Sequence, residues 1–152
     1  MRSRSAGFTL IELMVVVLLI AIASTVASLA LRDPAATRLE QEAARLTALL
    51  ESARAEARAS GLAARWEPRS ADSDQGPGFQ FIGMPESSDL PAHWLNEGVA
   101  AQIVGARAVV LGPEPMIGAQ RIVLRLDDQR LLLDTDGLGP FVVSANQAAE
   151  AR

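Results

Sequence analysis

Glu12 is the residue of this chain whose position most needs a chemical explanation. It stands at the start of a strongly apolar run, and Leu13 to Leu31 are nineteen consecutive residues without a charge. An unpaired carboxylate buried in hydrocarbon costs about 2 to 3 kcal/mol or more. The carboxylate therefore needs a cationic partner, a hydrated position near a membrane surface, or a place in a soluble core helix. Its position alone leaves all three explanations open.

Side chains for other kinds of chemistry are scarce. The chain contains no cysteine and a single histidine, His93. This composition excludes disulfides, thiolate metal sites, cysteine nucleophiles and metal sites that need two imidazoles. Gly76-Pro77-Gly78 lacks the lysine and the spacing of a phosphate-binding P-loop. We therefore predict that the protein is not an enzyme and has no catalytic residue and no cofactor. Trp66 and Trp94 are expected to serve as core or interface anchors.

Asp134 and Asp136 could offer oxygen atoms to a hard cation, because they alternate ahead of Gly137. The full spacing of an EF-hand loop and its distal glutamate are absent. A polar turn at the end of a strand is the simpler interpretation, so we predict no metal site.

The apolar run predicts a transmembrane helix within residues 8–31. At about 1.5 Å per residue, the charge-free stretch spans roughly the 30 Å hydrocarbon core of a bilayer. Arg2 and Arg4 precede the run and favour a cytoplasmic N-terminus. The remainder of the chain is then expected on the other side of the membrane.

A conventional secretory signal is the alternative interpretation of the same segment. Ala21-Ile22-Ala23 or Ser28-Leu29-Ala30 could serve as its small-residue cleavage site. However, the run exceeds the roughly 7 to 15 residues usual for the apolar core of such a signal, and a glutamate near its beginning is unusual. Both features favour a retained membrane helix.

Residues 32–60 are expected to form an amphipathic continuation of this helix. Asp33 is expected to cap the restart, with Pro34 in the first turn and Ser60-Gly61 as the stop. One apolar stripe should pack on a sheet, while the charged positions should be solvated, with Glu51 and Arg54 as an i,i+3 pair. The stripe comprises Leu39, Ala43, Leu46, Leu49, Leu50, Ala53 and Ala57, and the charged positions are Arg38, Glu40, Glu42, Arg45, Glu51, Arg54, Glu56 and Arg58.

From Leu62 onward, short apolar runs separated by turn residues predict an antiparallel sheet pattern. Asp127-Asp128-Gln129 is expected to be a hairpin turn, and Arg69 to Gly78 and Met84 to Pro91 are expected to be loops. A helix followed by several strands predicts an α+β fold, with the helix across one or two small antiparallel sheets. The expected strands are Ala63–Glu67, Gly78–Ile82, Val99–Ile103, Ala108–Leu111, Arg121–Leu126, Arg130–Asp134 and Phe141–Ser144.

The segment from Gly7 to Leu13, with the sequence Gly-Phe-Thr-Leu-Ile-Glu-Leu, resembles the prepilin cleavage and methylation motif of type IV pilins and type II secretion pseudopilins. The resemblance implies cleavage after Gly7 by a prepilin peptidase and N-methylation of the new terminal Phe8. It also implies that the Glu12 carboxylate pairs with the terminal amine of a neighbouring subunit when the helices stack in a filament, which removes an isolated charge from an apolar medium.

The ends of the chain resemble one branch of this superfamily, minor pseudopilin H of type II secretion. The resemblance is carried by Asp136 to Phe141 and by the link Leu31 to Pro34 with the helix after it. It implies a pilin-like fold with a leader at 1–7, a transmembrane helix at 8–31, its amphipathic continuation at 32–60 and a periplasmic β-rich domain at 61–152.

The same resemblance implies a structural role, at or near the tip of a periplasmic pseudopilus that exports folded proteins across the outer membrane. The implied location is the bacterial inner membrane, crossed once, and the pseudopilus after assembly. The implied partners are other pseudopilins, major and minor, the prepilin peptidase/N-methyltransferase and the inner-membrane assembly platform.

Two alternatives belong to other classes of machine or chemistry. A minor pilin of a type IV pilus or DNA-uptake system would share the leader and much of the fold, but DNA binding calls for a basic patch. The chain has 14 basic residues, all arginine, against 18 acidic ones, and acids predominate from Leu62 onward, so we predict no nucleic acid partner. A membrane-anchored periplasmic hydrolase would have to build its base on His93.

Overall fold

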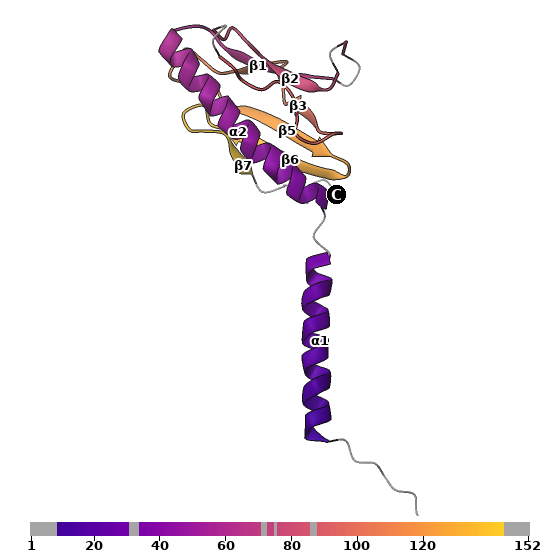
Figure 1. Cartoon of the computed structure of the whole chain (residues 1–152). Coiled ribbons are helices and arrows are strands. Elements are labelled where there is room, and N and C mark those ends of the chain that lie inside the picture. The colour runs from indigo at the N-terminus through magenta and orange to yellow at the C-terminus, as the bar shows by residue number, and fades with distance from the viewer. Residues whose placement is uncertain (1–8, 31–33, 71–72, 75, 86–87, 145–152) are drawn as a thin grey trace, which may run out of the picture. The chain divides into compact units, whose positions relative to one another are not determined.

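The charge-free N-terminal run forms a helix, α1, over Leu10–Ala30 (Figure 1). The computed structural model describes residues 9–30, 34–70, 73–74, 76–85 and 88–144, with side chains omitted for 25–30. The chain divides into one unit over Met1–Asp33 and a second over Pro34–Arg152, called here the C-terminal unit. A search of the described residues finds no helix that combines the length and the apolarity needed to cross a membrane.

The C-terminal unit begins with a second helix, α2, over Pro34–Ser60. Pro34 opens it, as predicted, since the first helical position needs no backbone N–H donor. Gly61 follows the helix with φ +68°, the left-handed conformation that glycine adopts at low cost. The predicted cap, Asp33, lies outside the described residues.

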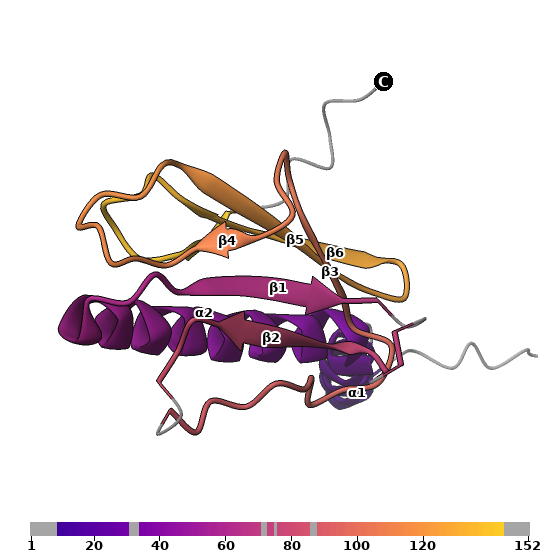
Figure 2. The ribbon, with the colours of Figure 1, turned by 90° about the horizontal axis from the view of Figure 1, so that it is seen from above.

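Two antiparallel sheets follow α2, and Figure 2 shows β1 and β2 of the first beside β5 and β6 of the second. The first has three strands in the order β2-β1-β4, and the second has four in the order β3-β5-β6-β7. All seven predicted strands and the α+β class are therefore confirmed. The strands are β1 Arg65–Arg69, β2 Gly78–Ile82, β3 Ala100–Ile103, β4 Val109–Val110, β5 Gln120–Leu126, β6 Gln129–Thr135 and β7 Val142–Ser144.

The predicted bounds of β2 are confirmed, and those of the other six strands shift by one or two residues. β1 runs two residues past its predicted end, through Pro68, although proline cannot donate to a sheet ladder. Pro68 is tolerated because β4 pairs only with Arg65 and Trp66, which leaves Pro68 a partner on the β2 side alone. The hairpin turn is also shorter than predicted, because Gln129 already pairs with Leu126 and belongs to β6.

Gln120 links the two sheets through its side chain. Its Nε2 donates to the carbonyl of Val110 at 2.9 Å, and its Oε1 accepts from the Val110 amide at 2.7 Å. The amide group thus bonds β4 as a neighbouring strand would. This contact covers part of an edge strand that would otherwise be open to pairing with another chain.

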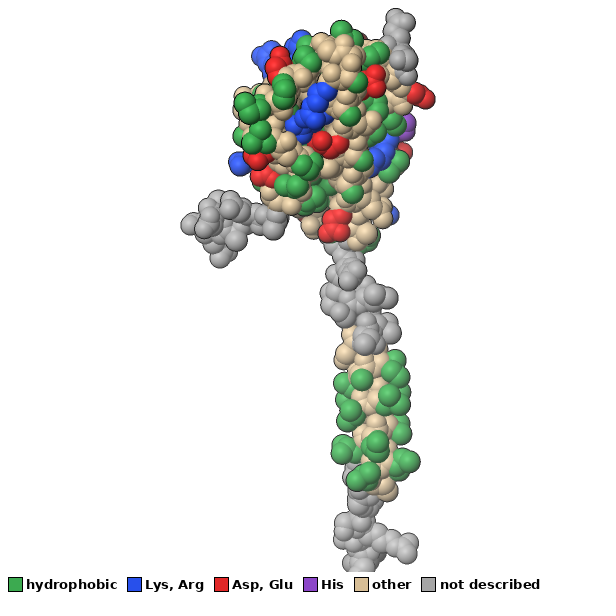
Figure 3. Space-filling model, turned by 90° about the vertical axis from the view of Figure 1, so that its left-hand side faces the viewer, with side chains coloured by type: hydrophobic (Ala, Val, Ile, Leu, Met, Phe, Trp, Pro, Cys, Tyr) green, Lys and Arg blue, Asp and Glu red, His purple; other side chains and the backbone are tan. Residues whose placement is uncertain are grey.

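The two units differ in what they expose. Every described side chain of α1 is exposed, from 78% for Leu10 to 40% for Val16 among its large apolar residues. Figure 3 shows these side chains as a hydrophobic covering on α1, whereas acidic, basic and apolar side chains are interspersed on the visible face of the C-terminal unit.

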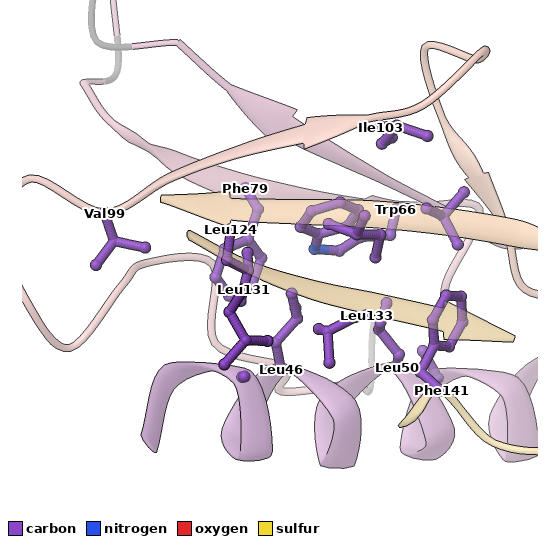
Figure 4. Packing of buried hydrophobic residues seen from close by; sticks show 14 of the residues in the cluster. Leu46, Leu50, Trp66, Phe79, Val99, Ile103, Leu124, Leu131, Leu133 and Phe141 are labelled. Carbon is purple, nitrogen blue, oxygen red and sulfur yellow. The ribbon is translucent and has the colours of Figure 1, made fainter. Parts of the chain in front are cut away.

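The core of the C-terminal unit lies between α2 and the sheets. Leu46 and Leu50 of α2 point toward Leu131 and Leu133 of β6 and toward Phe141 (Figure 4). Each of these leucines carries about 2 to 5 kcal/mol, by the usual cost of truncating a buried leucine to alanine. The predicted stripe is confirmed, with Leu39, Ala43, Leu46, Leu50, Ala53 and Ala57 buried and Leu49 partly buried.

The prediction that all charged positions of α2 are solvated is wrong for Glu42 and Arg54. Both side chains are buried, each with only 1% of its surface exposed. The spacing explains the error: Glu42 lies three residues after Leu39 and four before Leu46, so it shares their face of the helix. Arg54 lies four residues after Leu50 and three before Ala57, so it also shares the buried face. Both charges are retained on the buried face because other segments of the chain supply their hydrogen-bond partners.

Candidate functional site

Thr9 and Glu12 build the N-terminus of α1. The Glu12 amide lies 3.3 Å from Thr9 Oγ1 and 3.1 Å from the Thr9 carbonyl, and the Leu13 amide donates to the same carbonyl at 3.2 Å. Thr9 is therefore the N-cap, and the order Thr-x-x-Glu is that of a capping box. Two of the first amide groups of the helix obtain acceptors in this way.

The Glu12 side chain is exposed in the first turn of α1. A carboxylate is stabilised there by the positive end of the helix dipole, by about 0.3 to 1 kcal/mol. The ion pairs among the described residues join Arg45 to Glu42 and Arg54 to Glu51, so the described part of the chain supplies no cation to Glu12. Its carboxylate is available to a group from elsewhere.

The other predicted processing residues precede this cap. Gly7 and Phe8, and the orienting arginines Arg2 and Arg4, lie outside the described residues. Their predicted roles in cleavage, methylation and orientation stay predictions. The geometry adds that the first helical turn begins two residues after Phe8, with Glu12 in it.

Arg54 joins α2 to the loop after β6 within the C-terminal unit. Its Nη1 donates to the Gly139 carbonyl at 2.7 Å and to Glu51 Oε1 at 3.1 Å, and its Nη2 donates to the Gly137 carbonyl at 3.4 Å. Glu51 Oε1 also accepts from the Phe141 amide at 3.4 Å. The predicted Glu51–Arg54 pair thus exists, and it fastens the loop after β6 to α2.

Asp136 shapes this same loop as a polar turn. Its Oδ1 accepts from the amides of Gly139 at 2.8 Å and Leu138 at 2.9 Å. These backbone bonds, that of Gly139 first, hold the pKa of Asp136 below its ordinary value of 3.8, because they stabilise the charged carboxylate. The carboxylate is thus engaged in local structure.

Asp134, the second residue of the calcium hypothesis, is also engaged locally. Its Oδ1 accepts a short hydrogen bond from Ser144 Oγ, which joins β6 to β7. In the described part of the chain, no three acidic or histidine side chains gather closely enough to hold a metal ion.

Glu42 and Arg45 fasten the segment before β3 to α2. Glu42 Oε1 accepts from the Asn96 amide at 2.7 Å and from Asn96 Nδ2 at 3.0 Å. Arg45 Nη1 donates to the His93 carbonyl at 2.8 Å and lies 3.9 Å from Glu42 Oε2. Oε1 of the buried carboxylate is therefore satisfied by its own chain, whereas Oε2 accepts no hydrogen bond from the described residues and has only the Arg45 guanidinium near it.

His93, the only residue on which a hydrolase could be based, is exposed. The hydrogen bond from Arg45 is accepted by the backbone carbonyl of His93 and does not involve its imidazole. Its neighbour Trp94 packs edge-on against Phe79, with ring centroids 4.7 Å apart, and Trp66 is fully buried at 5.9 Å from the same ring. The predicted role of both tryptophans as anchors is confirmed, and this region is a packing centre.

The N-terminal segment matches the family model described as "Prokaryotic N-terminal methylation motif" over residues 2–28. This range includes Gly7, Phe8 and Glu12, and ends within α1. No curated protein matches the chain as a whole.

The fold is similar to the crystal structure of the type IV minor pilin FimU of Pseudomonas aeruginosa strain PAO1. The TM-score is 0.54, and the alignment covers 72% of this chain and 90% of FimU at 16% sequence identity. The chain has a pilin-like fold. This fold agrees with the packing of α2 on two small antiparallel sheets. At this identity the likeness concerns the fold alone.

Two features of this pilin-like fold were missed from the sequence. The capping box at Thr9 and Glu12 could have been found, since Thr-x-x-Glu ahead of an apolar run is a known helix-start signal. The burial of Arg54 was signalled only by its helical spacing. Its acceptors, Gly137 and Gly139, lie 83 and 85 residues away, and no local pattern brings them together.

Proposed function

We propose that this chain is a minor pseudopilin of a type II secretion system, a structural subunit that joins a periplasmic pseudopilus at or near its tip. The observation that carries the proposal is the methylation motif over residues 2–28, joined in one chain to a pilin-like fold. The proposed partners are other pseudopilins, the prepilin peptidase/N-methyltransferase and the inner-membrane assembly platform.

The proposed processing begins on the cytoplasmic side of the inner membrane. Arg2 and Arg4 hold the N-terminus there, the peptidase cleaves after Gly7, and Phe8 becomes an N-methylated terminus. Residues 8–31 anchor the subunit in the bilayer before assembly, because the sequence from Leu13 to Leu31 contains no charge that would oppose insertion. The C-terminal unit then lies in the periplasm.

Glu12 is the proposed assembly residue. Its carboxylate is exposed in the first turn of α1, where the positive end of the helix dipole stabilises it but no described cation pairs with it. In an apolar medium, the amine at Phe8 of a neighbouring subunit would remove the cost of an isolated charge, and a subunit in the wrong register would leave both charges unpaired.

A minor pilin of a type IV pilus is the second candidate. The likeness to FimU favours it, because FimU is itself a type IV minor pilin. The excess of acidic residues from Leu62 onward opposes the DNA-uptake variant of this candidate, since DNA binding relies on arginine and lysine contacts to phosphates.

A catalytic role has less support than a structural one. His93, the only histidine, is exposed and sits beside an aromatic packing centre, and no acid–base pair is built around it in the described part of the chain. The proposed activity is assembly, without a cofactor.

Cross-linking in the native host tests the choice of machine. A photo-reactive amino acid replaces Leu62 or Met116, two exposed positions on the C-terminal unit, and the linked neighbours are identified by mass spectrometry. We expect other pseudopilins and, in a strain that lacks this chain, loss of exported proteins from the medium. Contacts with pilus components alone, together with normal export, would replace the secretion assignment with the pilus assignment.

A further inference from the structure

Arg125 and Arg130 face each other directly across the β5–β6 pair. Both side chains are exposed, and like charges directly opposite one another destabilise an antiparallel pair. The ion pairs among the described residues involve neither guanidinium. The fold therefore carries a like-charge pair without an ion pair to a described acid, although Glu40 lines the same hollow as Arg130.

Protection of a sheet edge does not explain this pair. Charged side chains often guard edge strands against pairing with other chains. However, β5 and β6 are the two interior strands of the order β3-β5-β6-β7. Their outward face is the surface that the arginines occupy, and this surface faces away from the buried Ile122, Leu124, Leu131 and Leu133.

An apolar pair adjoins the arginines on this outward face. Val123 and Leu132 are also directly opposite each other, and each lies two residues from an arginine, so all four side chains share one side of the sheet. We call these four residues the outer-face block. Ala100 of β3 stands opposite Arg125 and Ser144 of β7 stands opposite Leu132, while the exposed Gln102 of β3 stands opposite Val123. A partner can therefore approach Arg125 and Leu132 past small side chains.

We propose that the outer-face block is a docking site for an acidic segment of another protein, in which a carboxylate and an apolar side chain lie two positions apart in extended conformation. Two opposed guanidiniums can hold one carboxylate with several charge-assisted hydrogen bonds. The apolar partner side chain covers Val123 and Leu132. Val123 and Arg125 are two residues apart on β5, so the apolar side chain and the carboxylate of the partner must also be two residues apart.

The acids around the block decide between a carboxylate and a polyanion. Asp127 and Asp128 form the exposed turn between the two arginines, and Asp134 lies four residues beyond Arg130. Arg121 stands directly opposite Asp134 and offsets its charge, so Asp127 and Asp128 are the acids that repel a chain of phosphates. A single carboxylate can bind between Arg125 and Arg130 while the rest of its chain avoids these two acids. Nucleic acid is therefore not the occupant that this surface favours.

The test measures binding to the full chain in a non-ionic detergent by fluorescence anisotropy. The probe is a fluorescent peptide of repeated Ser-Leu-Ser-Glu units, compared with its Ser-Leu-Ser-Gln analogue and with a single-stranded oligonucleotide. We expect the Glu peptide alone to bind, with a salt-sensitive affinity. Arg125→Gln and Arg130→Glu should each weaken it about tenfold or more, the factor expected for hydrogen bonds to a charged group.

Arg107→Glu is the matched control, because Arg107 is exposed in the loop before β4 and lies outside the block. Arg107→Glu should change the affinity for the Glu peptide less than about twofold. Arg130→Glu should have a melting temperature at or above that of the wild type, because the substitution turns a like-charge pair into an opposite-charge pair. Equal binding of the Gln peptide, tighter binding of the oligonucleotide, an equal effect of Arg107→Glu, or a lower melting temperature of Arg130→Glu would each overturn the proposal. The assay needs neither leader cleavage nor filament assembly, so its failure leaves the proposed function standing.

Discussion

Two glutamates, one on each helix, show how differently the two units of this chain treat charge. Glu42 is buried in the C-terminal unit and accepts two hydrogen bonds from Asn96. Glu12 is exposed on α1 among exposed apolar side chains, and the described part of the chain gives its carboxylate no cation. The C-terminal unit gives its buried glutamate hydrogen-bond donors from its own chain, whereas α1 presents both a charge and an apolar surface to something outside the chain.

Glutamine at position 12 is the change expected to have the largest effect. Glu12→Gln keeps the shape of the side chain and removes the charge that we propose for pairing between subunits, so export of folded proteins should fall to the background of a strain without the chain. Glu42→Gln is the matched control, because its Oε1 can still accept from Asn96, and it should export normally. Export assays of both strains, with protein levels checked by immunoblot, measure the contrast. Normal export by Glu12→Gln would remove the role proposed for Glu12.

Arg54→Ala should produce the largest loss of stability in the C-terminal unit. It removes a fully buried side chain together with its hydrogen bonds to Gly137, Gly139 and Glu51, so the free energy of unfolding should fall by about 3 kcal/mol. The two carbonyls keep the Ile117 amide and Thr135 Oγ1 as donors, which limits the loss. Arg58→Ala, which removes an exposed arginine from the last turn of the same helix, should cost about 1 kcal/mol or less. Urea denaturation of both variants gives the two values. Equal losses would mean that the burial of Arg54 contributes nothing.

Glu42→Ala should have an intermediate effect. It leaves the Asn96 amide without its acceptor and opens a cavity, so we expect the free energy of unfolding to fall by about 2 to 3 kcal/mol. Glu12→Ala should leave the unfolding of the C-terminal unit unchanged, because α1 belongs to the other unit. Thermal unfolding followed by tryptophan fluorescence reports on the C-terminal unit alone, since Trp66 and Trp94 both lie there. A similar loss in both variants would erase the contrast between the two glutamates.

A smaller effect should appear in acid, through Asp136. Its pKa is lowered in the folded state by the amides of Gly139 and Leu138, so its contribution to stability is complete above the unfolded value of about 3.8 and is lost as the pH falls through the lower folded value. Between pH 6 and pH 3, the melting temperature of the wild type should therefore fall more steeply than that of Asp136→Asn. Parallel curves for the two proteins would show that this carboxylate is not linked to folding.

The stripe on α2 and the seven strands were predictable because each follows from a local period of apolar residues. The burial of Glu42 was not predicted, because its charge was weighed above its helical spacing. Asn96 satisfies this carboxylate across 54 residues of sequence, a contact that only the folded chain provides. The extension of β1 through Pro68 was missed for a similar reason, since it depends on how far β4 reaches along β1.

The N-terminal site presents the opposite case. Gly7, Phe8 and Glu12 were identified from a short motif, and the methylation-motif match covers all three. The structure adds the cap at Thr9, but the chemistry proposed for these residues involves a peptidase and a neighbouring subunit. A single chain therefore reveals the position of Glu12 and leaves its partner to experiment.

Mass spectrometry of the membrane-extracted protein, co-expressed with a prepilin peptidase/N-methyltransferase, tests the central claim most directly. The account predicts a chain that starts at Phe8 and carries a methyl group on its terminal nitrogen, with residues 1–7 removed. Without the peptidase, the intact leader should remain. A chain that keeps its leader in the presence of the enzyme, or that is cut after Ala23 or Ala30 as a secretory signal would be, would contradict it.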